Sequence, residues 1–139
     1  MTQTSLLEVQ TAMVTKLKAN TTLTSIVTGV FDWGAVPENQ AFPYIAVGDN
    51  TEGPDNTFGR RGYEATCTLH IWDGGDSVSG FARCYQILAQ MNASLDQQAL
   101  VLSSQAHVGT WYEFSQTMND PGANSIRHMP VRYRFNTQE

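Results

Sequence analysis

The sequence predicts an α+β domain in which one N-terminal helix and one long helix lie on one face of a mostly antiparallel sheet. Apolar residues recur at helical spacing in residues 5–20 and 76–95, and they alternate with polar residues in 63–72 and 128–135. Helical and strand segments are therefore grouped along the chain, an order typical of α+β proteins. The length suits one domain, so we expect a single unit over residues 1–139 with a substantial core.

The first helix is expected over residues 5–20. Ser5 and Glu8 have the spacing of a capping box, in which each side chain accepts a hydrogen bond from the other residue's amide. Asn20 is the expected end of this helix. Its apolar stripe consists of Leu6, Val9 or Gln10, Met13 and Leu17.

A short second helix is expected over residues 22–28, with Gly29 ending it. Residues 30–33 then read as a short strand. After a loop with two prolines, a strand should start at Pro43 and run to residue 48. Alternation along residues 30–33 sends either Phe31 or Trp33 outward, which makes Trp33 a candidate interface residue.

Residues 49–62 form a long polar segment between two strand patterns, so we expect a loop at the tip of a long hairpin. The pair Arg60 and Arg61 is the main charge cluster there. A solvated loop tip is one interpretation. The other is a contact arm whose arginine forks bind carboxylates of a neighbouring chain, with Phe58 and Asp55 as further contact candidates.

The clearest strand is expected over residues 63–72. Trp72 falls on the face that points away from the helices, so it is a candidate anchor for a protein interface. The inward face should contain Tyr63, Ala65, Cys67, Leu69 and Ile71.

The long helix should begin at Asp76 or Ser77, as its N-terminal cap, and end near residue 95. The wide apolar stripe of this helix suggests that the helix lies across the sheet. The expected stripe is Val78, Phe81, Ala82, Tyr85, Leu88, Met91 and Leu95.

The last third reads as strands over residues 100–102, 106–116 and 128–135, with a Pro-Gly turn at 119–122. We expect Trp111 to pack in the core. The inward face of the last strand should consist of Met129, Val131, Tyr133 and Phe135.

The composition argues against a nucleic-acid binder, because eight Lys and Arg face thirteen acidic residues and the net charge is -5. Only 15% of residues are charged, which suits a subunit that packs against copies of itself. The start of the chain lacks the pattern of a signal peptide, and no apolar run is long enough to cross a membrane. We therefore expect synthesis in a cytoplasm and no membrane partner.

No group of reactive side chains with a known catalytic spacing occurs, so we expect no enzyme activity, no cofactor and no metal. Cys67 and Cys84 lie in apolar patterns and read as small buried hydrophobes. Asp73 reads as a strand end and Asp76 as a helix cap. Three histidines on different strands read as surface residues, namely His70, His107 and His128.

The order of these segments resembles the tail-completion (tail-to-head joining) family of long-tailed bacteriophages. The segments are "KLKAN" followed by "GVFD", then "VPENQAFPYIAVGD", "GYEATCTLHIWD", "GFARCYQILAQMNASL", "LVL" and "VRYRF". They cover nearly the whole chain. The strand around Pro43 and the "LHIW" strand before the long helix are the most specific pieces.

The resemblance implies a structural virion subunit that forms a ring, commonly six-fold, at the head-proximal end of the tail. Its implied partners are copies of itself, the tail tube protein and the head connector protein, with DNA only passing through the channel. Alternatives are a tail terminator, a head-completion protein of the connector, or a bacterial binding module outside viruses.

Overall fold

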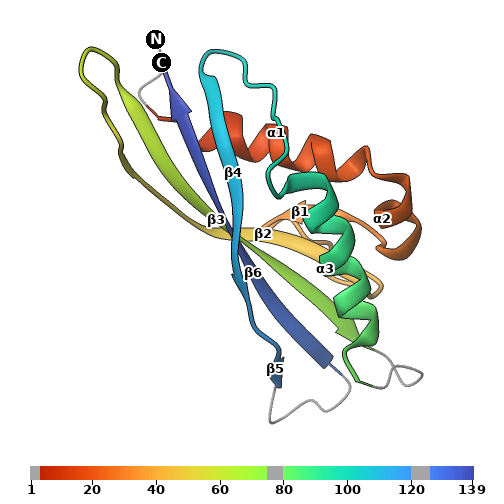
Figure 1. The fold of residues 1–139 in the computed structure, drawn as a ribbon. Helices are drawn as coiled ribbons and strands as arrows, with labels where there is room; N and C mark the ends of the chain where they lie inside the picture. Colours follow the sequence, from red (N-terminus) through yellow and green to blue (C-terminus); the bar gives the residue numbers. More distant parts are fainter. Residues whose placement is uncertain (1–3, 75–79, 120–125) are drawn as a thin grey trace.

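The computed structural model describes residues 4–74, 80–119 and 126–139, and it confirms the predicted α+β class. The helices lie together on one side of a long twisted sheet (Figure 1). The elements are α1 (Leu6–Lys18), α2 (Thr21–Ile26), β1 (Val30–Asp32), β2 (Tyr44–Pro54), β3 (Gly62–Gly74), α3 (Ala82–Leu95), β4 (Ala106–Ser115), β5 (Met118–Asn119) and β6 (Ile126–Gln138).

The sheet has the order β1-β2-β3-β6-β4, and the short β5 also pairs with β6. β1 runs parallel to β2, whereas every other pairing is antiparallel. The longest ladder joins β3 to β6, from Gly62 opposite Gln138 to Gly74 opposite Ile126. The last strand of the chain therefore lies in the middle of the sheet, between β3 and β4.

The core lies between this sheet and the helices. The predicted inward residues of β3 and β6 are buried, and both cysteines are buried and unpaired, as expected. Burial raises the pKa of the Cys67 thiol to about 12 and that of Cys84 to about 11, so neither thiol is reactive at neutral pH. From the helices the core receives Val9, Met13, Leu17, Leu23, Ile87, Met91 and Leu95.

α3 differs from its prediction in its first residue and in part of the face that it buries. It begins at Ala82, with Phe81 as its cap, and the predicted caps lie outside the described residues. Arg83, in its first turn, forms an ion pair with the buried carboxylate of Asp73 at the end of β3. Cys84 faces inward, whereas Ala82 and Tyr85 are exposed, so the predicted stripe was wrong at these two positions. Phe81 packs against the core as predicted, and Val78 lies outside the described residues.

The start of α1 is correct within one residue, but the predicted capping box does not form. The Ser5 amide and hydroxyl donate instead to Oε2 of Glu52 on β2, at 2.7 and 2.6 Å. A carboxylate at this position also interacts favourably with the positive end of the helix dipole. Glu8 accepts hydrogen bonds from Ser103 and Ser104, which come from the segment before β4.

α1 ends at Lys18, and Asn20, its predicted stop, is instead the N-terminal cap of α2. The Leu23 amide of α2 donates to the Asn20 side chain at 3.0 Å. The same side chain donates to Ser94 Oγ on α3 at 2.9 Å. α2 ends at Ile26, three residues before the predicted stop, because Val27 is extended and already packs into the core.

The predicted loop over residues 49–62 was too long. β2 continues to Pro54, so only residues 55–61 connect the two long strands of the hairpin. After a bulge between Gly48 and Thr51, where Asp49 has a φ of 53°, β2 pairs with β3 again from Thr51 to Pro54, within the polar segment. Residues 100–102 form no strand, and Val101 is 93% exposed.

We predict that Glu52→Ala lowers the free energy of unfolding by about 1–2 kcal/mol, because α1 loses its N-terminal acceptor. Urea unfolding followed by circular dichroism at pH 7 measures the change. The matched control is Glu64→Ala, which removes an exposed acid from β3 and should change stability by less than about 0.5 kcal/mol. Equal losses in the two variants would contradict this role of Glu52.

Candidate protein interfaces

Residues 55–61 form a turn that is held by its own hydrogen bonds. The Thr57 amide donates to the Arg60 carbonyl at 2.9 Å, and the Arg60 amide donates back to Thr57 at 3.2 Å. Gly59 has a φ of +94°, which favours glycine at this place. The Asn56 side chain accepts from the Gly62 amide at 3.1 Å. These hydrogen bonds define the conformation of the turn at the end of the hairpin.

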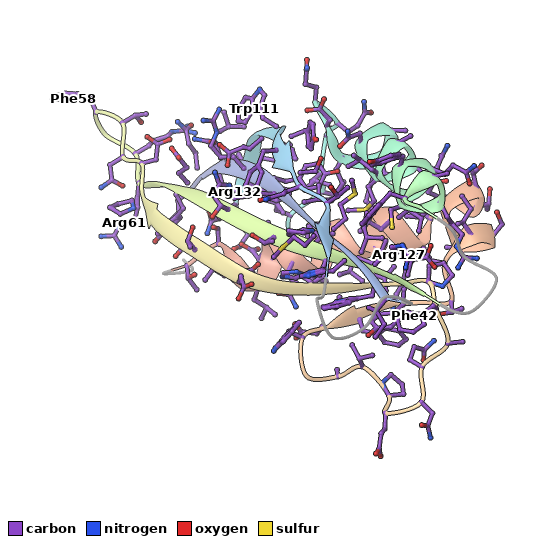
Figure 2. All side chains as sticks on the ribbon, turned by 90° about the horizontal axis from the view of Figure 1, so that it is seen from below. Phe42, Phe58, Arg61, Trp111, Arg127 and Arg132 are labelled. Atoms are coloured by element: carbon purple, nitrogen blue, oxygen red, sulfur yellow. The ribbon has the colours of Figure 1, made fainter. Side chains whose placement is uncertain are left out.

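Three of the four contact residues predicted in this segment project from it. Phe58 is completely exposed at its far end, and Arg61 projects nearer its base (Figure 2). Arg60 is exposed as well. Asp55 lies at the base of the turn, where its carboxylate accepts from the Asn136 side chain at 2.8 Å. We call Phe58, Arg60 and Arg61 the hairpin tip.

A row of aromatic and imidazole rings crosses the outer face of the sheet at its other end. The rings of Trp72 and His128 are stacked, with centroids 3.9 Å apart and an interplanar angle of 4°. His70 Nδ1 lies 2.7 Å from His128 Nε2, and His70 Nε2 lies 3.1 Å from Asp49 Oδ2. The Trp33 ring is 5.7 Å from that of His70.

This cluster corrects the prediction that His70 and His128 are separate surface residues. The ladder places Trp72 directly opposite His128, and His70 is then its diagonal neighbour on the same face. His70 is only 8% exposed as a result. Alternation put all three residues on outward faces, but only the pairing of β3 with β6, which the sequence does not specify, brings them together.

The Asp49 carboxylate can only accept a hydrogen bond, so the proton between the two side chains lies on His70 Nε2. Burial, followed by the proximity of His70, lowers the pKa of His128 to about 4.

Trp33 and Trp72, the two tryptophans predicted as interface anchors, lie at one place. Trp33 is 63% exposed and Trp72 is half-buried. With Tyr44 and Val36 they line a shallow cavity of about 290 Å³. We call Trp33 and Trp72 the tryptophan surface. Trp72 is paired with Tyr44 at the start of β2 and Trp33 lies against Gly48, whereas the hairpin tip follows the end of this strand.

Trp111 does not pack in the core as predicted. It is half-buried on the outer face of β4, under the Arg134 guanidinium at 4.9 Å from the ring centroid. Arg132 lies in the same way over Phe114, at 4.7 Å. Two irregularities in β4, at residues 107–109 and 112–114, interrupt the alternation from which inward and outward faces were predicted.

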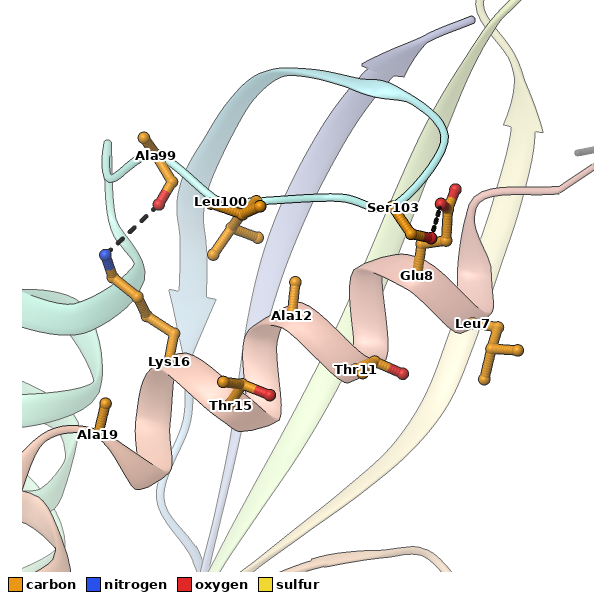
Figure 3. A pocket seen from close by; sticks show the side chains of 11 residues that line it. Leu7, Glu8, Thr11, Ala12, Thr15, Lys16, Ala19, Ala99, Leu100 and Ser103 are labelled. Atoms are coloured by element: carbon orange, nitrogen blue, oxygen red, sulfur yellow. Dashed lines mark hydrogen bonds between the residues drawn. The ribbon is translucent and has the colours of Figure 1, made fainter. Parts of the chain in front are cut away.

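A groove runs along the helix layer between α1 and residues 99–103 (Figure 3). Its volume is about 580 Å³, and Leu7 at one end is 76% exposed. The sequence did not reveal it, because residues 100–102 were predicted as a strand. We call this feature the helix groove; it is lined by Leu7, Glu8, Thr11, Thr15, Leu100 and Val101.

Glu8 connects the two walls of the helix groove. Its Oε1 accepts from Ser103 and from the Ser104 amide and hydroxyl. Burial alone would raise the pKa of Glu8, but these hydrogen bonds outweigh it and lower the pKa, so the side chain keeps its negative charge at neutral pH.

Neither a metal centre nor a membrane span is present in the part of the chain that the structure describes. Within residues 4–74, 80–119 and 126–139, no three His, Cys, Asp or Glu side chains are grouped to hold a metal ion. Among the same residues, no helix is both long and apolar enough to span a bilayer.

Comparison with known proteins identifies one family and two solved structures with a similar fold. The family model described as "Tail completion protein gp17" matches residues 11–138. A chain in the virion of a native gene transfer agent particle has a TM-score of 0.87 and 20% identity, covering 99% of this chain and 100% of its own. The gp17 protein of bacteriophage SPP1 has a TM-score of 0.60 and 21% identity, covering 91% and 86%. No curated protein matches.

The histidine cluster predicts a pH dependence of stability. Folded His128 takes up a proton only near pH 4, whereas the unfolded chain does so near the ordinary pKa of 6.5. Between these values the unfolded state holds more protons, so stability falls as the pH drops from 7 towards 4. We expect His128→Gln to reduce this fall, by less than about 1 kcal/mol per pH unit because the ring is partly exposed.

Urea unfolding of both proteins at pH 7 and pH 5 measures this difference. The exposed variant Gln116→Asn, which has no titratable group, should keep the slope of the unchanged protein. An NMR titration in which the His128 ring changes protonation near pH 6.5 would contradict the expectation.

Proposed function

Since this chain belongs to the tail completion protein gp17 family, we propose that it forms a ring at the head-proximal end of a phage tail and joins the tail to the head. Membership in the family makes the chain a structural component of the virion tail. The proposal adds its place in that tail, its arrangement as a ring of six copies and its mechanical role.

The proposed partners follow from that position. Each copy contacts two further copies in the ring, the tail tube protein on one side and the head connector protein on the other. DNA only passes through the channel. A net charge of -5 is compatible with this, since a subunit with few cations does not retain DNA by its phosphates.

The observation that carries the proposal is the separation of the exposed contact residues into two different surfaces. The hairpin tip follows Pro54 at the end of β2, whereas Trp72 is paired with Tyr44 at its start and Trp33 lies against Gly48 in between. At about 3.3 Å per residue, the strand spans roughly 20 Å from Pro54 back to Gly48 and roughly 33 Å back to Tyr44. A subunit with two distant and unlike surfaces is able to contact a neighbour in the ring with one and an axial neighbour with the other.

The chemistry of both surfaces is that of protein contacts. Tryptophan and arginine are the residue types that most often dominate the energy of such interfaces. Trp33 offers a large exposed ring beside a shallow cavity, and Arg60 and Arg61 offer planar forks that bind carboxylates. We assign Trp33 and Trp72 to the axial contact and the hairpin tip to the contact between copies.

Particles made without this chain test the proposal. We expect filled heads and separate tails of normal length under the electron microscope, because each part assembles by itself and only their junction is missing. Overlong tails would assign the chain to tail termination, and unfilled or leaking heads with no other defect to head completion. Joined, infectious particles would overturn the proposal.

We predict that Trp33→Ser lowers the yield of joined particles about tenfold or more, because an interface anchor of this kind contributes at least about 1.4 kcal/mol. Counting joined particles by microscopy measures the effect. Met118→Ser, which removes a similarly exposed apolar side chain from β5, is the matched control and should join normally. A normal yield with Trp33→Ser would remove the tryptophan surface from the axial contact.

A further inference from the structure

We propose that the Phe58 side chain of one copy inserts into the helix groove of the next copy, so that hairpin tip and helix groove form the contact between subunits. This inference rests on the ring proposed above and identifies its contact surfaces. Each copy has both the protruding Phe58 side chain, called the knob below, and the helix groove, called the hole.

Phe58 has the properties of a knob. Its ring is fully exposed, although burying an aromatic side chain of this size is worth roughly 2–3 kcal/mol. The paired backbone hydrogen bonds between Thr57 and Arg60 hold the turn in shape before any contact is made. Insertion therefore orders little additional chain, which reduces the entropy cost of binding.

The helix groove has the properties of the matching hole. Its volume of about 580 Å³ is ample for one aromatic ring. Leu7 and Val101 stay largely exposed at its rim, and Leu100 and Ala12 form apolar walls (Figure 3). A ring inserted here would cover apolar surface that the single chain leaves in water.

The charges of the two surfaces are complementary at the Glu8 end of the helix groove; Lys16 lines the groove further along α1, where it donates to the Ala99 carbonyl. Arg60 and Arg61 follow Phe58 by two and three residues, so they arrive at the groove with it. Glu8 lies beside Leu7 and keeps its negative charge, since its hydrogen bonds lower its pKa. Oε1 accepts all three of those hydrogen bonds and Oε2 is buried, so Glu8 would attract the arginines by its charge rather than through a direct hydrogen bond.

The placement of the two surfaces is compatible with a ring. The hairpin tip extends beyond the end of the sheet, whereas α1 lies in the helix layer, with its start held to Glu52 of β2 (Figure 1). A contact between two unlike surfaces repeats from copy to copy, and it closes into a ring if the rotation allows.

Cross-linking in assembled particles tests the inference. The variant carries Phe58→Cys together with Thr15→Cys, an exposed position that lines the groove, and the reagent is bismaleimidoethane. The native Cys67 and Cys84 do not interfere, because both are buried and their thiol pKa values are raised to about 12 and 11. We expect a ladder of this chain on a denaturing gel, ending at the closed ring.

A matched pair, Phe58→Cys with Ser25→Cys on the exposed side of α2, should give no ladder. Independently, Phe58→Asp should lower the yield of joined particles about tenfold or more, whereas Phe58→Leu should retain most of it. Since Phe58 contacts no core residue, neither change should affect folding.

The outcomes separate this inference from the function on which it rests. If the cysteine variant enters particles and joins them but gives no ladder, the knob and hole are wrong while the joining role stands. Cross-linking of Thr15→Cys to a tail or head protein would also overturn the inference, because the groove would then hold an axial neighbour. Joined particles in the complete absence of the chain would overturn the proposed function itself.

Discussion

The pairing of β3 with β6 is the constraint on which the rest of the structure depends. Thirteen residues of each strand are in register, and the inward side chains of both build the centre of the core. The same register stacks Trp72 on His128 outside. A shift of one residue would exchange the two faces, so one ladder determines both the core and the outer surface.

The helix layer is attached to this ladder by a few polar side chains as well as by apolar packing. Glu52 of β2 holds the start of α1, and the Tyr133 hydroxyl of β6 donates to Asn92 of α3 at 2.6 Å. Asn20 joins the start of α2 to α3. Because these bonds are directional, they set how the helices lie on the sheet and hence the position of the helix groove.

Local patterns in the sequence were sufficient for the class of fold, for the start of α1 and for the inward faces of β3 and β6. They failed where distant residues decide the outcome. Ser5 and Glu8 have an ideal local spacing, yet each has a partner from another part of the chain. Trp111 faces outward because irregular pairing disturbs alternation, and the histidine cluster requires a register that only the folded sheet defines.

The irregular pairing of β4 affects how readily another chain can pair with the edge of the sheet. An outermost strand with regular, open backbone groups is a template onto which other chains add without limit. β4 closes the sheet on one side, and its two irregularities distort that template. The opposite border, β1, has only three residues. Both edges of the sheet therefore resist the open-ended strand pairing that leads to fibrils.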